Sequence, residues 1–214
     1  MSKAIKIKIL DSKLSNVNSV KNMIDWIGYD GVIVEDLKKI NSEDRVILPG
    51  IGHFGKAMDI LNERGIIDQI KEVALIKKNP ILGICLGMQL LMDKSEESPN
   101  SKGLGLISGS VKKFNFSKNE LKVPHVGWNN IQFKKNHSFM NEFDIKKSRY
   151  YFVHSYFVDC DNNNDVLAET SYGINFSSII NKNNIFGFQF HPEKSLKHGA
   201  RLLKNFCEYE VWKE

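Results

Sequence analysis

The sequence has few cysteines and no long apolar segment. Its 214 residues include Cys85, Cys160 and Cys207, which are far apart and form no C-x-x-C pair. An odd number of widely spaced cysteines argues against a disulfide framework or a cysteine-based zinc site, and it favours a reducing cytoplasm. No apolar run approaches the ~18–20 residues that a membrane span requires. The first ten residues alternate lysine with isoleucine, which is not the pattern of a secretory signal peptide.

An excess of one charge is also largely missing. Thirty Lys and Arg against 25 Asp and Glu leave a formal net charge of +5, and the longest basic runs are pairs such as Lys38-Lys39. Short runs of this kind are typical of solvated surfaces, so we expect neither a nucleic-acid nor a membrane partner. With 42% hydrophobic residues the chain can bury a sizeable core, and we expect one domain over residues 1–214.

The order of the expected elements indicates an α/β fold. Strand patterns alternate with helical patterns up to about residue 92, which predicts parallel strands joined by right-handed crossovers; the strands are expected at 4–10, 31–34, 45–48 and 81–84. After Gly109 short strands follow one another between polar loops, at 111–116, 130–133, 150–158, 166–171, 177–181 and 185–190. Ser195 is expected to cap a last helix. The prediction is a mostly parallel central sheet flanked by helices, with an additional antiparallel β-rich portion.

The stretch Ile81–Leu91 carries the strongest chemical signal. An apolar strand ends at Cys85, glycines stand two residues before and after it, and a helical pattern follows at once. This arrangement is typical of a nucleophile elbow, in which small neighbours let strand and helix pass closely. The turn would expose the sulfur at a helix N-terminus, where the thiolate is favoured, and would aim the Leu86 N–H at a developing oxyanion. The alternative is a buried structural cysteine.

A second glycine-rich segment, Gly50-x-Gly52-x-x-Gly55, matches the spacing of a dinucleotide-binding loop. It does not follow the first strand, and the acidic residue expected ~20 positions later at the end of another strand is missing. We therefore expect no NAD and no other cofactor. The remaining interpretations are a plain tight turn, or a loop beside Cys85 whose backbone N–H groups at Ile51 and Gly52 supply a second oxyanion donor.

The segment Phe186–Ser195 supplies a candidate base. In an extended chain residues two apart share a face, so His191 and Glu193 are expected to point the same way. A carboxylate beside a histidine fixes its tautomer and stabilises the imidazolium, which a Cys–His pair requires. An incidental surface pair is one alternative. A zinc site is another, but no third ligand has suitable spacing, so we expect no metal.

Two further histidines lie in the β-rich part. His154, in an apolar strand, is a second candidate base, and a structural role fits it better. His125 lies between Pro124 and Gly127 in what reads as a loop, where a role in an interface or a gate competes with packing.

With these motifs in view, the chain resembles the class I (triad) glutamine amidotransferases, which have a flavodoxin-like fold. The resemblance runs from about Arg45 to the end of the chain. Its specific motifs are the elbow and His-Pro-Glu; Pro-His-Val-Gly-Trp-Asn at 124–129 and Phe-Val-His-Ser-Tyr at 152–156 are similar to the glutaminase subunits of imidazole glycerol phosphate synthase. The resemblance implies hydrolysis of L-glutamine to glutamate and ammonia through a thioester. The ammonia would pass to a cyclase/synthase subunit of a heterodimer, in histidine biosynthesis.

The resemblance also implies roles for individual residues. The catalytic triad would be Cys85, His191 and Glu193, with oxyanion donors at Leu86, Ile51 and Gly52. Glutamine would be held by Gly52, Gln89, Glu97, His154, Ser155 and Tyr156, where Glu97 meets the substrate ammonium or is only an exposed acid. The partner subunit would contact Asn16, Pro124, His125, Trp128, Asn129 and Lys194.

One segment departs from the family pattern. After the first strand the family usually has a tyrosine and glycines, whereas residues 11–19 keep only Asn16 and Ser19 of that pattern. A paralogous glutaminase that supplies ammonia to a surface-sugar amidotransferase is therefore an alternative. A γ-glutamyl hydrolase or cysteine peptidase would use the same triad, and a binding module with an inactive site is the non-enzymatic alternative.

Overall fold

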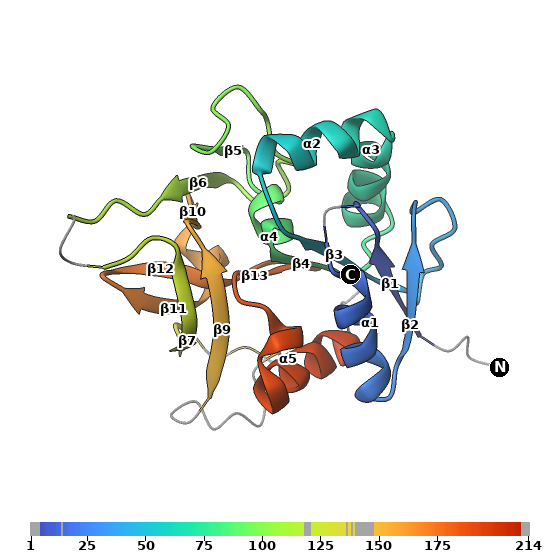
Figure 1. The fold of residues 1–214 in the computed structure, drawn as a ribbon. Helices are drawn as coiled ribbons and strands as arrows, with labels where there is room; N and C mark the ends of the chain where they lie inside the picture. The colour runs from blue at the N-terminus through green and yellow to red at the C-terminus, as the bar shows by residue number, and fades with distance from the viewer. Residues whose placement is uncertain are drawn as a thin grey trace.

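The computed structural model describes residues 5–13, 15–117, 121–135, 137, 139 and 148–210. Strands and helices alternate in the first part (Figure 1): β1 (Lys6–Leu10), α1 (Val17–Trp26), β2 (Asp30–Val34), β3 (Arg45–Gly50), α2 (Phe54–Glu63), α3 (Ile66–Lys71), the π-helix η1 (Glu72–Ile76), β4 (Ile81–Cys85) and α4 (Leu86–Leu90). Strands dominate the second part: β5 (Lys94–Ser95), β6 (Gly109–Lys113), β7 (His125–Asn130), β8 (Gln132–Phe133), β9 (Arg149–His154), β10 (Tyr156–Cys160), the 3₁₀ turn η4 (Asn163–Asp165), β11 (Val166–Tyr172), β12 (Ile174–Lys182), β13 (Ile185–Phe188), the 3₁₀ turn η5 (Pro192–Lys194) and α5 (Leu196–Glu208).

One long mixed sheet runs through the described part of the chain. Its order is β2-β1-β3-β4-β13-β12-β10-β6-β5, with β11 beside β12 and β8 beside β11. The strands β2, β1, β3, β4 and β13 are parallel, and their order is 2-1-3-4-5 when β13 counts as the fifth strand. That order is typical of flavodoxin-like folds, whose sites lie at the carboxyl ends of the strands. The predicted α/β class is confirmed.

The strand β13 joins the two parts of the molecule. The sequence placed residues 185–190 in the antiparallel portion, and β13 does pair antiparallel with β12. On its other edge, however, it runs parallel to β4, with Phe188 opposite Ile84. The residues that follow β13 therefore emerge at the same edge of the sheet as Cys85, because parallel strands end on one side.

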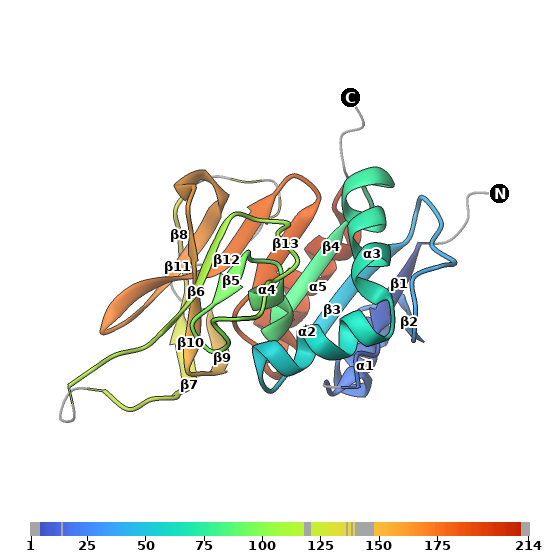
Figure 2. The same ribbon diagram turned by 90° about the horizontal axis from the view of Figure 1, so that it is seen from above.

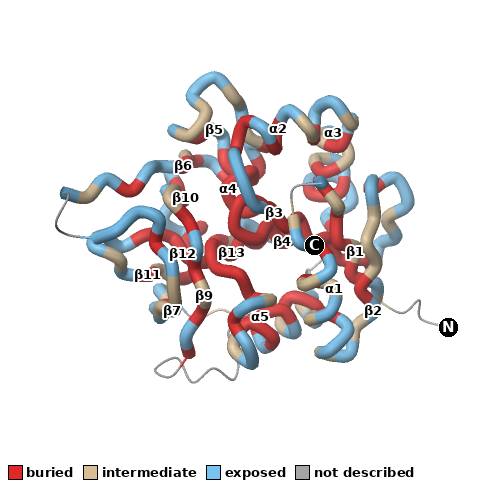
Figure 3. The backbone as a smooth tube through the Cα atoms, viewed as in Figure 1, coloured by how far each residue is buried: buried red, intermediate tan, exposed pale blue. Residues whose placement is uncertain are grey.

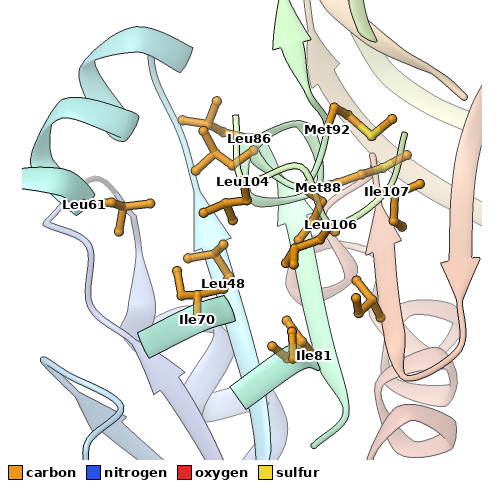
Figure 4. Close-up of a cluster of buried hydrophobic side chains, with 14 of the residues drawn as sticks. Leu48, Leu61, Ile70, Ile81, Leu86, Met88, Met92, Leu104, Leu106 and Ile107 are labelled. Atoms are coloured by element: carbon orange, nitrogen blue, oxygen red, sulfur yellow. The ribbon is translucent and has the colours of Figure 1, made fainter. Parts of the chain in front are cut away.

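Helices cover both faces of the parallel sheet. Figures 1 and 2 show α2, α3 and α4 on one face and α1 and α5 on the other. Successive residues of β4 enter different clusters, because side chains alternate along a strand: Ile81 packs under α2–α4 and Leu82 packs toward α1 and α5. Figure 4 shows the first cluster, which includes Leu86 and Met88 of α4 and Leu48 of β3.

The helix α5 closes the second face through an apolar stripe. Leu202, Leu203 and Phe206 are fully buried, which contributes about 1.5–3 kcal/mol for each side chain. Ser195 stands at the N-cap as predicted, but its side chain makes no capping bond. Instead its Oγ donates to the His191 carbonyl at 2.6 Å. None of the described helices combines the length and the apolar character that a membrane crossing requires.

The antiparallel part differs from the sequence prediction in two places. Residues 123–129 read as a loop, but His125–Asn130 forms β7, which pairs antiparallel with β9 in a separate small sheet. Residues 150–158 read as one strand, but the chain breaks at Ser155 and passes from the small sheet into β10 of the main sheet. The strand β7 was not predicted because it lies at the periphery (Figure 3). Exposed residues alternate along it with buried or half-buried ones, so its sequence lacks the apolar run of a core strand.

Candidate active site

The elbow forms at the junction of β4 and α4. Cys85 has φ 54° and ψ −109°, a backbone conformation that costs energy for any residue except glycine. A Cβ atom on Gly87 would lie 1.8 Å from the Leu48 carbonyl oxygen, and one on Gly83 would lie 2.5 Å from the Gly87 oxygen. The predicted need for small neighbours is confirmed, because here backbone packs directly on backbone.

The glycine-rich segment Gly50–Gly55 lies beside the elbow. Gly50 pairs with Cys85 across β3 and β4, and a Cβ atom there would lie 3.0 Å from the Gly87 backbone nitrogen. Gly52 has φ +102°, which suits glycine alone. Ile51, Gly52 and Leu86 all line the same pocket as Cys85. The glycine spacing thus supports close contact with the elbow.

His191 lies next to an acid, as the spacing predicted. Its Nδ1 and the Glu193 Oε1 are 2.8 Å apart, and both side chains are less than a tenth exposed. The backbone of β9 holds the segment in place: the His191 N–H donates to the Tyr151 carbonyl at 2.9 Å, and the Tyr151 N–H donates to the Ser195 Oγ at 3.0 Å. Ser195 therefore ties the His191–Glu193 segment to β9.

The charge on the imidazole is strongly favoured. Burial opposes the charged ring, but the Cys85 sulfur and the Glu193 carboxylate outweigh it and raise the pKa of His191 to about 10. Since Nδ1 faces the acid, Nε2 is the nitrogen left to exchange a proton. Nε2 is buried and, among the described residues, has no partner in hydrogen-bonding geometry. A cysteine beside a charged imidazole whose second nitrogen is not occupied by another protein group is suited to nucleophilic attack followed by proton transfer.

A cavity of about 370 Å³ contains the sulfur and the imidazole. Small-molecule sites commonly have ~300–1,000 Å³, so a single amino acid fits. Every residue to which the resemblance assigns glutamine lines it, together with Pro124 and Val153: Gly52, Gln89, Glu97, His154, Ser155 and Tyr156. The fold thus brings the strands β4, β9 and β10, the helix α4 and several loops to one cavity.

Glu97 has a structural partner that the sequence did not reveal. Its Oε2 accepts the Phe54 N–H at 2.7 Å, at the start of α2, where His53 offers no side-chain cap. A carboxylate at a helix N-terminus is favourable because the helix dipole is positive there. Glu97 is half-buried and lines the pocket, so it is not merely an exposed acid.

His125 and His154 form a buried pair at the opposite wall. The His125 Nδ1 and His154 Nε2 are 3.0 Å apart, and the His154 Nδ1 donates to the Tyr156 carbonyl at 2.8 Å. The Asn129 amide nitrogen donates to the Ser171 carbonyl at 3.0 Å and to the His125 Nε2 at 3.3 Å, so His125 must donate from its Nδ1 to the His154 Nε2. Both rings are therefore neutral. Burial lowers the pKa of His125 to about 4 and that of His154 to about 3.

The residues assigned to the partner surface do not all lie there. His125 is only 3% exposed and packs between Phe152 and Tyr172, so the packing interpretation holds for it. Trp128 is 46% exposed and meets Tyr151 edge to face, and the Lys194 Nζ lies 5.8 Å from the Tyr151 ring centroid.

The other residues assigned to the partner are accessible. Pro124 and Asn16 are exposed and Asn129 is half-buried. Asn16 also accepts the Ser19 N–H at 3.3 Å and so caps α1, which contacts η5. Exposed apolar side chains include Val126, on β7 with Asn129, and Ile51 and Val153, which line the pocket.

Gln189 is a site residue that the sequence reasoning missed. It is fully buried, and its Nε2 lies 3.9 Å from the Cys85 sulfur. Its signal was available: the alternation that pairs His191 with Glu193 also puts Gln189 on that face. An amide in an apolar strand has no catalytic spacing of its own, so local sequence does not single out Gln189.

The sequence pattern of the family described as Glutamine amidotransferase class-I matches residues 8–209. The chain belongs to this family.

Within it, the chain is similar to the imidazole glycerol phosphate synthase subunit HisH of Sulfurimonas denitrificans, with 49% identity over 205 residues that cover 95% of this chain and 98% of that protein. It is also similar to the imidazole glycerol phosphate synthase subunit HisH 2 of Methanococcus maripaludis, with 45% identity over 202 residues, 94% of this chain and 98% of that protein.

Solved structures agree on the fold. PurLQS from Thermotoga maritima superposes with a TM-score of 0.73 at 19% identity, over 97% of this chain and 99% of that chain. A crystal structure of a glutamine amidotransferase has a TM-score of 0.71 at 18% identity, over 94% of this chain and 97% of that chain. At these identities the likeness concerns the fold alone.

Proposed function

We propose that this chain, acting as one domain, is the glutaminase subunit of an imidazole glycerol phosphate synthase in histidine biosynthesis. It would hydrolyse L-glutamine and pass ammonia to a cyclase/synthase subunit bound over the exposed face around Trp128. The observation that carries the proposal is the meeting of Cys85, in a strained elbow, with the buried His191–Glu193 pair in one pocket. We also propose a cytoplasmic location, since all three cysteines are free and buried.

The chemistry follows from the positions of the three side chains. The Cys85 thiolate attacks the side-chain amide carbon of glutamine, and backbone N–H groups of Leu86 and the Ile51–Gly52 loop hold the oxyanion. His191 gives its proton to the nitrogen, the C–N bond breaks, and ammonia leaves a thioester. His191 then takes a proton from water, whose oxygen attacks the thioester, and the C–S bond breaks to release glutamate. Acid–base help contributes ~10²–10⁴-fold and an oxyanion donor ~10²–10³-fold.

The decisive experiment replaces the nucleophile. Cys85→Ala in the complex with the synthase subunit should release no ammonia from glutamine, yet the complex should still form imidazole glycerol phosphate from added ammonium salt. Cys160→Ala is the matched control, because Cys160 is buried in β10 and does not line the pocket. Normal glutamine-dependent turnover by Cys85→Ala would refute the assignment.

Residues 11–19 depart from the family pattern, and this favours a second candidate function. That candidate is a glutaminase that supplies ammonia to a surface-sugar amidotransferase. Co-purification of the native partner followed by ammonia-transfer assays separates the two. Glutamine-dependent synthesis of imidazole glycerol phosphate supports the first function, and transfer only to a sugar acceptor supports the second. Cleavage of γ-glutamyl peptides in preference to free glutamine would contradict both.

A further inference from the structure

Two buried side-chain amides connect the pocket wall to the nucleophile. The Gln89 Nε2 donates to the Tyr156 carbonyl at 3.0 Å and to the Gln189 Oε1 at 3.2 Å. The Gln189 Nε2 lies 3.9 Å from the Cys85 sulfur, which is within hydrogen-bonding distance for so large an atom. Gln189 is fully buried and Gln89 is 5% exposed, so water does not compete for these groups.

The direction of these bonds is determined by the one group that cannot rotate. A backbone carbonyl only accepts hydrogen bonds, so Gln89 must turn its amino group toward Tyr156 and, from the same nitrogen, toward Gln189. Gln189 must therefore present its oxygen to Gln89. Its amino group then faces Cys85. The opposite orientation of Gln189 would set two donors against each other and an oxygen against the sulfur.

The side chain of Gln189 is not needed to hold its strand segment. The backbone N–H of Gln189 already donates to the Ser178 carbonyl of β12 at 3.0 Å. A buried amide is costly unless its polar atoms are bonded, and an apolar side chain of the same length would fill the space more cheaply. The polar group therefore has a use beyond packing, and the atom that it faces is the reacting sulfur.

We propose that Gln189 donates a hydrogen bond to the Cys85 sulfur and holds the thiolate in position for attack, with Gln89 and the Tyr156 carbonyl setting its direction. The bond to sulfur stands on geometry alone. Its consequence for turnover rests on the proposed glutaminase function. Gln189 would thus share with His191 the stabilisation of the anionic nucleophile.

The test is the pH dependence of alkylation at Cys85, followed by mass spectrometry of the peptide in the full chain. Gln189→Met removes the donor and keeps the length of the side chain. Because a hydrogen bond to a charged group is lost, the midpoint of the alkylation-rate profile should rise by about one pH unit, which means a roughly tenfold lower thiolate fraction at pH values below the midpoint. Ser178→Ala is the matched control, since Ser178 is equally buried beside Gln189, and it should leave the midpoint unchanged.

Turnover by the complex separates positioning from mere packing. In Gln189→Met, the acidic limb of the kcat–pH profile should move up by about one pH unit, in step with alkylation; a purely structural loss would lower kcat at every pH instead. An unchanged midpoint in a folded Gln189→Met variant would overturn the proposal, even with the glutaminase function intact. If the wild type hydrolyses no glutamine, the midpoint still decides whether the bond exists.

A measurement on the wild type covers the case in which Gln189→Met fails to fold. The side-chain amide protons of Gln189 in a ¹⁵N-labelled chain should shift with the same pH midpoint as alkylation of Cys85. Signals that do not respond through that midpoint would contradict the proposed bond.

Discussion

The two walls of the pocket hold their histidines in opposite charge states. His191, just after β13, and His154, the last residue of β9, are both buried to more than nine-tenths. The Glu193 carboxylate and the Cys85 sulfur raise the pKa of His191 to about 10. Burial lowers the pKa of His154, whose neighbours are another histidine and a carbonyl, to about 3. Burial alone therefore does not decide the charge of an imidazole; the partner of each nitrogen does.

The walls also differ in what holds them together. At the elbow, glycines let backbones pack against one another without any intervening side chain. At the β7–β9 wall, a relay of side-chain hydrogen bonds runs from Asn129 through two rings to Tyr156. The elbow requires residues without side chains, and the β7–β9 wall requires side chains that hydrogen-bond. Substitutions should therefore destabilise the two walls for different reasons.

The largest expected effect comes from adding one methyl group to the first wall. In Gly87→Ala the new Cβ would meet the Leu48 carbonyl at 1.8 Å, so we expect a loss of about 4 kcal/mol or more in the free energy of unfolding, and no turnover. Gly127→Ala on β7 is the counterpart: its Cβ has open space, but φ is +132°, and a loss of about 1–3 kcal/mol is expected. Urea unfolding measures both free energies. Equal losses in the two variants would contradict the proposed difference between the walls.

The next effect concerns the charge on His191. Glu193→Gln keeps an acceptor but removes the negative charge, so the pKa of His191 should fall and kcat should drop by ~10²–10⁴-fold. NMR titration of the ring and steady-state kinetics measure the two results. Glu169→Gln, which removes an acid paired with exposed Lys134 in the antiparallel part, is the control and should leave kcat within about twofold. A similar drop in the control would show that the loss is not specific to the triad.

The smallest effect is expected at the neutral pair His125 and His154, where the contribution to stability depends on pH. The pKa values of His125 and His154 are lowered in the folded state, so the unfolded state binds more protons as the pH falls from the ordinary 6.5 toward 4. Their contribution to stability is complete above pH 6.5 and is lost on acidification. His191 has the opposite sign: its contribution is complete below pH 6.5 and declines toward pH 10.

His125→Phe tests this pair. The phenyl ring keeps the stacking between Phe152 and Tyr172 but leaves the His154 Nε2 without a donor, which costs about 1–3 kcal/mol at pH 7. The stability profile between pH 6.5 and 4 should flatten because one titrating group is gone. Urea midpoints at pH 7, 5.5 and 4.5 measure both results; an unaltered acid slope would show that the pair does not titrate in this range.

How far the site could be predicted follows the sequence separation of its contacts. The Cys85 elbow and the His191–Glu193 pair depend on neighbours two residues away, so backbone geometry alone indicates them. The contacts that were missed join distant segments: Gln89 and Gln189 are 100 residues apart, Glu97 and Phe54 are 43 apart, and His125 and His154 are 29 apart. Local residue spacing cannot predict such pairs.

The sequence by itself determined the alternation of strands and helices, the tight turn at Cys85 and the acid beside His191, because periodicity and the small size of glycine act over a few residues. Only the tertiary structure decided that β7 is a strand, that His125 is buried and that Gln189 faces the sulfur. These outcomes depend on which strand ends meet at one edge of the sheet, and on which polar groups find partners there once water is excluded.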